Sequence, residues 1–286
     1  MRCNFRYAQC ILGCMMICLP LLAAAKERIV TLSPAINEIV FALGAGEKVV
    51  GTTTYADYPP AAQKLPKVGG YFSPSLEKIL ALDPTLVILQ PNNQKLKATF
   101  QTLKIPTLTV PIDTLSHILS SIEAMGKRLG KEKEAIRIIS RIRNELDAIQ
   151  GIVRNKRILI VFGANTTLEH GIFVAGQNLY YDEIIRASGN QNALQSKRKG
   201  QPVLGKESLI ALDPDIIILL TATAKAKGIG KEALLAPWRT LPLRAVHIGD
   251  IYLIDKEYAL IPSDRLRYFI RNFKEVLDGY RRKHAQ

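Results

Sequence analysis

The chain has 286 residues, of which 48% are hydrophobic and 22% are charged, and its formal net charge is +14. This length and apolar content suffice for one large or two smaller packed domains, and they exclude an intrinsically disordered chain. The basic residues are spread along the sequence without a nucleic-acid recognition motif, so we expect no nucleic-acid partner. The charge indicates either a solvated basic surface or a field that attracts an anionic ligand.

The first 25 residues have the composition of a secretory signal. Arg2 and Arg6 precede an apolar stretch over residues 11–22, and three alanines at 23–25 form a cleavage site. This stretch is shorter than a membrane-spanning helix, and no later segment has enough consecutive apolar residues to span a bilayer. We therefore predict a signal peptide over residues 1–25, export to the periplasm, and a net charge of +12 once the two arginines are removed.

All the cysteines lie inside this signal, at positions 3, 10, 14 and 18. The mature chain therefore has no disulfide, no thiolate metal site and no cysteine nucleophile. Residues 11–14 also resemble a lipoprotein cleavage box. Lipid anchoring at Cys14 is thus the alternative to a free periplasmic protein.

Beyond residue 26, short apolar runs alternate with amphipathic segments, which predicts α/β layering with mostly parallel sheets. Ser-Pro pairs at residues 33 and 73 begin two helices, because Ser is a favourable N-cap and Pro suits the first helical position. In chain order we expect strands at 28–32, 49–53, 86–89, 107–110, 157–162, 215–220 and 251–254, and later helices at 177–187, 204–212 and 263–282.

Apolar residues recur at helical spacing between residues 115 and 150, and residues 131–150 contain no helix breaker. We interpret residues 126–150 as a long helix that joins an N-terminal lobe (26–125) to a C-terminal lobe (151–286). Such a helix is stiff, so the lobes should move little about a ligand cleft between them. The alternative is a long core helix within a single domain.

An internal repeat supports two similar lobes. Residues 76–89 align with residues 206–219 at an offset of 130, with seven of fourteen positions identical. Each copy predicts a helix, an Asp-Pro break and a buried strand, because Pro stops the helix and restricts the residue before it. Glu77 and Glu207 begin the two helices. A carboxylate there interacts with the helix dipole, which contributes about 0.3–1 kcal/mol, or else the pair contacts a symmetric partner.

In residues 28–38, 55–60 and 68–77, and in both Leu-Asp-Pro repeats, the chain resembles the periplasmic binding proteins that serve vitamin B12, ferric-siderophore and haem importers. The resemblance covers essentially the whole mature chain. It implies a monomeric, cofactor-free, non-enzymatic protein that delivers a metal chelate to an inner-membrane ABC permease dimer. In this family one glutamate per lobe pairs with permease arginines, and the matching positions are Glu77 and Glu207.

The vitamin B12-binding members of this family hold their ligand with aromatic residues and one acidic residue of the second lobe. The resemblance assigns these roles to Tyr55, Tyr71, Phe173 and Asp255. Residue type adds Phe72, Tyr258 and Arg239 as further candidates for ligand binding.

Two departures from the vitamin B12-binding pattern leave the identity of the ligand open between a corrinoid and a ferric siderophore. Gln201 and Ala259 stand where vitamin B12-binding members have a tryptophan and an arginine. Haem-binding relatives use Tyr or His as an iron ligand, and Tyr71 lies one residue from that position; haem or a small nickel or iron chelate is thus an alternative. Siderophore-binding relatives use a basic cleft, and the basic candidates on second-lobe loops are Arg198, Lys199, Arg239 and Arg244.

The four histidines, at positions 117, 170, 247 and 284, lack the paired spacing of a metal site. No Gly-x-Ser-x-Gly segment is present to serve as a hydrolase nucleophile elbow. An exported two-lobed α/β enzyme is the alternative from a different functional class. It would require a nucleophile or an acid–base pair in the cleft.

Overall fold

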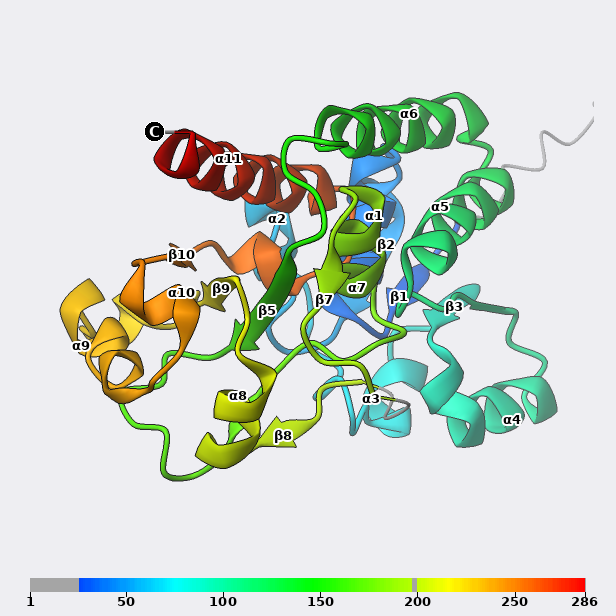
Figure 1. The fold of residues 1–286 in the computed structure, drawn as a ribbon. Coiled ribbons are helices and arrows are strands. Elements are labelled where there is room, and N and C mark those ends of the chain that lie inside the picture. The colour runs from blue at the N-terminus through cyan, green and yellow to red at the C-terminus, as the bar shows by residue number, and fades with distance from the viewer. Residues whose placement is uncertain (1–25, 197–199, 286) are drawn as a thin grey trace, which may run out of the picture.

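The structure, a computed structural model, describes residues 26–196 and 200–285 (Figure 1). The expected signal peptide with Cys14, and the basic candidates Arg198 and Lys199, lie outside these residues. Within the described ranges, no helix is both long and apolar enough to cross a membrane.

The N-terminal lobe contains a four-stranded parallel sheet with the strand order β2-β1-β3-β4. Its strands are β1 (Ile29–Thr31), β2 (Val49–Thr52), β3 (Leu86–Leu89) and β4 (Thr107–Thr109). Its helices are α1 (Pro34–Ala42), η1 (Gly46–Lys48), α2 (Pro60–Gln63), α3 (Leu76–Leu80), η2 (Pro91–Asn93) and α4 (Gln94–Thr102), where η denotes a 3-10 helix. The central strands β1 and β3 are wholly buried, as expected for a parallel sheet covered on both faces.

The C-terminal lobe contains a second four-stranded parallel sheet with the order β10-β9-β5-β7. Its strands are β5 (Arg157–Phe162), β7 (Gln191–Asn192), β9 (Ile216–Leu220) and β10 (Ile251–Ile254). A small antiparallel pair joins β6 (Ile172–Phe173) to β8 (Val203–Leu204). The helices are α7 (Tyr180–Ala187), α8 (Lys206–Leu212), η3 (Lys225–Lys227), α9 (Lys231–Leu235), η4 (Trp238–Thr240), α10 (Arg244–His247), η5 (Glu257–Leu260) and α11 (Leu266–His284).

The two sheets have the same topology. In both, the first strand of the lobe is central, the second lies at one edge, and the third and fourth follow on the other side. The repeated Asp-Pro turn sets the start of the third strand in the same way: the backbone N–H of Arg28 donates to Thr85 Oγ1, and that of Arg157 donates to Asp215 Oδ2, each at 2.8 Å. The prediction of two similar α/β lobes is confirmed.

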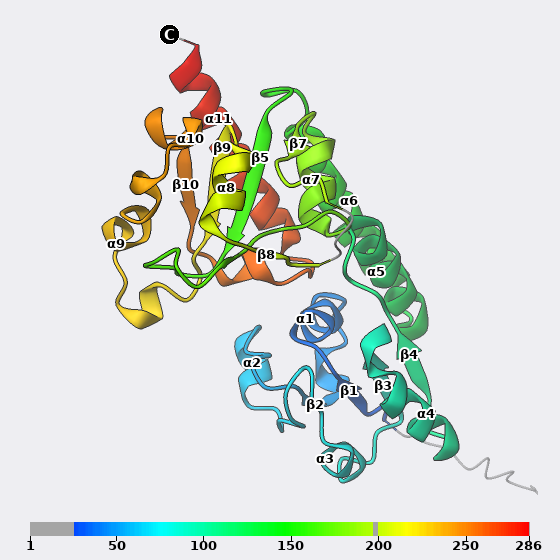
Figure 2. The same cartoon turned by 60° about the horizontal axis from the view of Figure 1, so that its bottom comes forward.

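The connection between the lobes is two helices, α5 (Leu115–Leu129) and α6 (Glu132–Ala148), so the prediction of one helix over residues 126–150 is wrong. Gly130 adopts a left-handed conformation (φ 65°), and the N–H of Lys131 donates to the carbonyl of Gly126. This is a helix C-cap, which glycine adopts without steric cost. The pair runs along one side of both lobes, and α6 packs on α5 and α11 (Figure 2).

One cluster of buried apolar residues is continuous between the lobes. It includes Ile39 of α1, Ile122 of α5, Ile142 of α6, Ile160 of β5 and Phe269 of α11, each fully buried. Two further clusters fill the outer side of each sheet separately. Because rotation of one lobe against the other would expose the shared cluster to water, this packing opposes a large hinge motion.

Candidate functional site

A hollow of about 670 Å³ lies between the two lobes. It forms where strands of both sheets end: Ser33 and Gln90 follow β1 and β3, and Phe162 ends β5. Parallel α/β sheets bind ligands beyond the carboxyl ends of their strands, and small-ligand sites have volumes of roughly 300–1,000 Å³. The hollow has the position and size of a ligand cleft, as expected from two facing lobes.

Two predicted ligand-binding residues, Tyr71 and Phe72, line this cleft from the N-terminal lobe. Their rings meet edge to face, with centroids 4.5 Å apart at 77°. The Tyr71 hydroxyl donates to Gln90 Oε1 at 2.9 Å, and burial raises the pKa of this hydroxyl although Asn92 and Gln90 oppose the shift. Phe72 is 87% exposed. Tyr71 is therefore a neutral, positioned phenol that supports an open aromatic surface.

The C-terminal lobe contributes aromatic side chains to the cleft that the sequence did not predict as ligand-binding residues. Tyr180 and Tyr181 begin α7 and line the cleft with Phe162, with Tyr181 centred 4.0 Å from Tyr180 and 5.3 Å from Phe162. The Tyr181 hydroxyl donates to the carbonyl of Ala259 at 2.5 Å, and burial raises the pKa of both tyrosines. These neutral rings pack at the start of α7 against η5, which contains Ala259, and form one side of the cleft.

Three other predicted ligand-binding residues lie away from the lining of this hollow. Tyr55 is 79% exposed and adopts a positive φ of 67°. Phe173 is half exposed on β6. Tyr258 donates from its hydroxyl to Asn272 Oδ1 at 2.9 Å, which directs it toward α11. The structure therefore brings Tyr71 and Phe72 together in the cleft but does not add these three aromatics to its walls.

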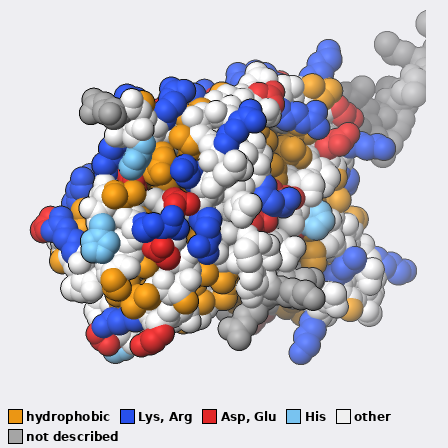
Figure 3. All heavy atoms as spheres, viewed as in Figure 1, with side chains coloured by type: hydrophobic (Ala, Val, Ile, Leu, Met, Phe, Trp, Pro, Cys, Tyr) orange, Lys and Arg blue, Asp and Glu red, His pale blue; other side chains and the backbone are white. Residues whose placement is uncertain are grey.

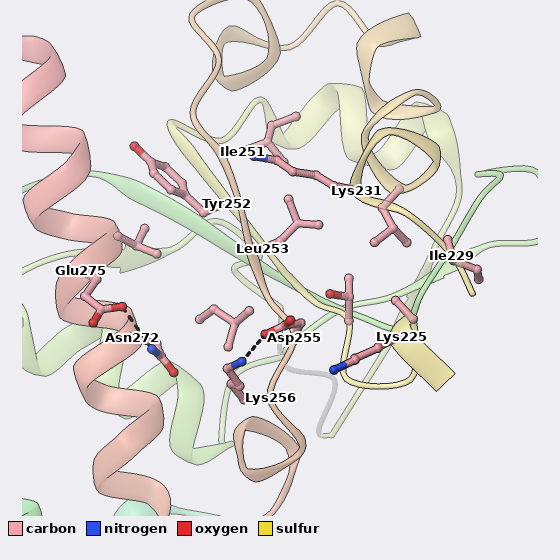
Figure 4. A pocket seen from close by; sticks show the side chains of 15 residues that line it. Lys225, Ile229, Lys231, Ile251, Tyr252, Leu253, Asp255, Lys256, Asn272 and Glu275 are labelled. Atoms are coloured by element: carbon pink, nitrogen blue, oxygen red, sulfur yellow. Dashed lines mark hydrogen bonds and ion pairs between the residues drawn. The ribbon is translucent and has the colours of Figure 1, made fainter. Parts of the chain in front are cut away.

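Asp255, predicted to face the ligand, lines a different hollow of about 600 Å³ beside the edge strand β10 (Figure 4). Its Oδ1 lies 3.0 Å from Lys256 Nζ, and Lys225 extends toward the same end of the groove. Arg239, the remaining candidate, is exposed on η4 and forms an ion pair with Glu232 of α9. Asp255 and Arg239 thus each form an ion pair within the C-terminal lobe, and both lie outside the cleft lining.

A buried ion pair joins the lobes behind the cleft. Glu38 of α1 and Arg265, just before α11, are about 2% and 5% exposed. Arg265 donates from Nη2 to Glu38 Oε1 at 2.5 Å and from Nε to Oε2 at 2.9 Å, and Ser263 Oγ also donates to Oε2, at 2.5 Å. Such a bidentate guanidinium–carboxylate pair is both strong and directional. It fixes α1 of the first lobe against α11 of the second.

The surroundings of this pair complete an interlobe clamp, which we define as Glu38, Tyr58, Glu257, Ser263 and Arg265. The guanidinium lies 3.8 Å above the Tyr58 ring, and its Nη1 donates to Glu257 Oε1 at 3.0 Å. Next to the clamp, burial and the charge of Glu38 raise the pKa of Asp264 to about 6. The clamp connects positions 227 residues apart in the chain.

Glu77 and Glu207, the predicted docking residues, occupy matching positions in the two lobes. Each is the second residue of its helix, α3 or α8, and each is exposed. Neither carboxylate has an ion pair among the described residues. Figure 1 shows α3 and α8 on the same side of the molecule, opposite α6 and α11. Both carboxylates are therefore free to meet cations of another molecule.

Charged groups elsewhere do not assemble a metal site. In the part of the chain that the structure describes, no three His, Cys, Asp or Glu side chains are grouped to hold an ion. Lys and Arg side chains are scattered over the face in Figure 3, with acidic side chains among them. Asp113 is the one carboxylate that the described residues place on the cleft lining, and its Oδ1 lies 2.6 Å from His117 Nδ1.

Comparison with known proteins agrees with this geometry. Residues 29–258 match the model of a family described as periplasmic binding protein. An uncharacterized ABC transporter substrate-binding lipoprotein, YvrC of Bacillus subtilis, is 30% identical over 217 residues, which cover 72% of this chain and 67% of the relative. The vitamin B12-binding protein of Salmonella typhimurium is 28% identical over 210 residues, covering 72% and 76%.

Solved structures share the whole architecture. The apo periplasmic heme-binding protein RhuT of Roseiflexus sp. RS-1 has a TM-score of 0.73 and 26% identity, with 90% of this chain and 99% of that chain covered. The periplasmic vitamin B12 binding protein BtuF of Vibrio cholerae has a TM-score of 0.72 and 25% identity, with coverage of 88% and 96%. The chain therefore belongs to the periplasmic binding protein family and is the substrate-binding component of an ABC importer.

Proposed function

We propose that the interlobe cleft captures a metal chelate whose metal is already fully coordinated, namely a corrinoid or a ferric siderophore. The observation that carries the proposal is Phe72, a large aromatic side chain that is 87% exposed in a hollow whose lining is mostly apolar. A single exposed ring is common on soluble proteins, but Phe72 adjoins Tyr71 and the apolar lining of the hollow, and a contiguous apolar surface of this kind marks binding sites. Opposite this ring, residues 260–262, Tyr180 and Tyr181 supply apolar surface for the other side of a bulky ligand.

The side chains of the cleft suit a chelate that brings its own metal ligands. The Tyr71 hydroxyl is bonded to Gln90 and has a raised pKa, which disfavours the tyrosinate that would ligate iron. The Asp113 carboxylate is engaged by His117. The vitamin B12-binding relatives support the corrinoid reading.

Haem is the second candidate. The heme-binding structural relative RhuT favours it, since the two chains are alike over 90% of this chain. Haem ligated from the cleft would require the Tyr71 hydroxyl to lose its proton and its hydrogen bond to Gln90, since His117 is not among the residues that line the cleft. A substitution that removes only the Tyr71 hydroxyl therefore separates haem from a precoordinated chelate.

We further propose that Glu77 and Glu207 dock the protein on an inner-membrane permease dimer. Two equivalent exposed carboxylates, one on each of two similar lobes, fit a partner with two equivalent cationic sites. Charge pairs at such a contact contribute to registry and association rate as well as to affinity. In this proposal residues 1–25 are a cleaved signal, the mature monomer works in the periplasm without enzymatic activity, and lipid attachment at Cys14 is the alternative.

Calorimetric titration of the mature protein with a panel of corrinoids, ferric siderophores and haem tests the ligand assignment. One corrinoid or siderophore is expected to bind with one-to-one stoichiometry. Phe72→Ala should weaken that binding about tenfold or more, because burial of a Phe ring contributes about 1.5–3 kcal/mol. Tyr71→Phe should change it little, whereas bound haem would be strongly affected.

Ile136→Ala serves as the matched control, because Ile136 is an exposed apolar residue of α6 outside the cleft. It is expected to bind the chelate as the wild type does. Equal affinity of the Phe72→Ala variant and the wild type for every ligand of the panel would refute the assignment of the cleft.

A further inference from the structure

A third hollow, of about 320 Å³, lies between α6 and α11, away from the cleft. Arg141 and Glu145 face it from α6, and Arg267 and Arg271 from α11, each pair spaced by four residues and thus on one side of its helix. Figure 1 shows these two helices side by side, on the side of the molecule opposite α3 and α8. We name the hollow the arginine pocket; Asn144 and Tyr268 complete its lining.

The residues that line the arginine pocket carry a net positive charge. Three guanidinium groups meet one carboxylate, so the lining carries two positive charges in excess. Glu145 is already bound by Arg271, whose Nε donates to Oε1 at 2.6 Å. Arg141 has no polar partner among the described residues. The excess on the lining therefore belongs to Arg141 and to Arg267, whose charge also acts on the neighbouring Asp264 carboxylate.

Arg267 is held in place, but one of its hydrogen-bond donors has no partner in the described part of the chain. Its Nη2 donates to the Tyr268 hydroxyl at 2.7 Å, and its guanidinium lies 4.6 Å from the centre of the same ring. Its Nε is buried without a hydrogen-bond partner among the described residues. A buried polar group that lacks a partner costs free energy, which an acceptor brought by a ligand would recover.

We propose that the arginine pocket is a binding site for a phosphate group. A phosphate group is anionic both as inorganic phosphate and as a diester, and its oxygens accept from several guanidinium groups at once, which is the geometry that arginine favours. A phosphate bound in the arginine pocket would link α6 to α11. The pocket shares no residue with the cleft, so its occupant is independent of the chelate.

Two sources could supply this group: a soluble phosphate or phosphate ester, and the headgroup of a phospholipid. The experiment therefore has two arms, calorimetric titration with inorganic phosphate against chloride at equal ionic strength, and flotation with phosphatidylglycerol or phosphatidylcholine vesicles. Each arm compares the wild-type mature protein with Arg141→Gln and Arg143→Gln. Within the described residues both arginines are exposed on α6 and neither forms an ion pair. Arg143 lies outside the pocket, so the two variants lose the same charge at different places.

Saturable binding is expected in at least one arm, and Arg141→Gln should weaken it about tenfold or more, because hydrogen bonds between charged groups contribute about 1.5–3 kcal/mol. Arg143→Gln should bind as the wild type does. The arm that responds identifies the source. The site is refuted if neither arm shows saturable binding, or if Arg141→Gln and Arg143→Gln behave alike.

Discussion

Replacing Glu38 by glutamine is expected to lower the free energy of unfolding by about 3–5 kcal/mol, because it leaves the buried Arg265 guanidinium without its principal counter-charge. Glu38 and Arg265 are almost completely buried, and three hydrogen bonds converge on the Glu38 carboxylate. Urea unfolding of the mature protein, followed by circular dichroism, measures the change. The clamp joins α1 to the start of α11, so its loss should also loosen the lobes.

Glu257→Gln is the matched control for this result. It removes a carboxylate from the same guanidinium, but the Glu257 side chain is 67% exposed. Exposed ion pairs contribute about 0–1 kcal/mol, so a small loss is expected. Glu38→Leu combined with Arg265→Met should recover much of the stability lost in Glu38→Gln, since both buried charges are then absent. Similar losses in Glu38→Gln and Glu257→Gln would contradict the clamp.

Replacing Glu77 and Glu207 together by alanine is expected to abolish uptake through the importer while ligand affinity stays unchanged. Both carboxylates are exposed on helix ends that face the same side, and both lie outside the cleft lining. Removing them should leave permease cations unpaired at the interface, which costs about 2–5 kcal/mol for each hydrogen-bonded pair. Growth dependent on the transported chelate, together with calorimetry on the purified variant, measures both properties.

A charge-matched control is available on the same chain. Glu47 and Glu123 are exposed and have no ion pair among the described residues, and neither lies on α3 or α8. Glu47→Ala with Glu123→Ala therefore removes the same charge away from the docking surface and should transport normally. Uptake that persists in the Glu77→Ala, Glu207→Ala variant would show that docking depends on other residues.

Much of the fold could be predicted from the sequence because its signals are local. The Asp-Pro turns at residues 83–84 and 213–214 stop a helix and start a buried strand within a few residues, and both lobes repeat them. The helix break at Gly130 was harder to predict from the sequence. Its left-handed cap depends on the bond from Lys131 to Gly126, and glycine also occurs inside helices, as Gly126 itself shows.

Only part of the cleft lining could be proposed from the sequence, because its geometry depends on how the lobes pack. Tyr71 and Phe72 lie within the segment 68–77 that carries the family resemblance, whereas the segment with Tyr180 and Tyr181 predicts only a helix. Their place in the cleft follows from the contact of α7 with Ala259 of η5. The clamp could not be read from spacing, since Glu38 and Arg265 are 227 residues apart. Asp255 comes directly after the edge strand β10 and lines a separate groove beside that strand, which its position in the sequence did not show.

If the metal chelate binds between the two similar lobes, its metal lies in the cleft beside Phe72. The most direct measurement is an anomalous difference map, collected at the absorption edge of the bound metal from crystals of the mature protein with the tightest chelate of the panel. One strong peak is expected in the cleft, between Phe72 and the segment 260–262. A peak in the groove beside β10, or on the outer surface of either lobe, would contradict it.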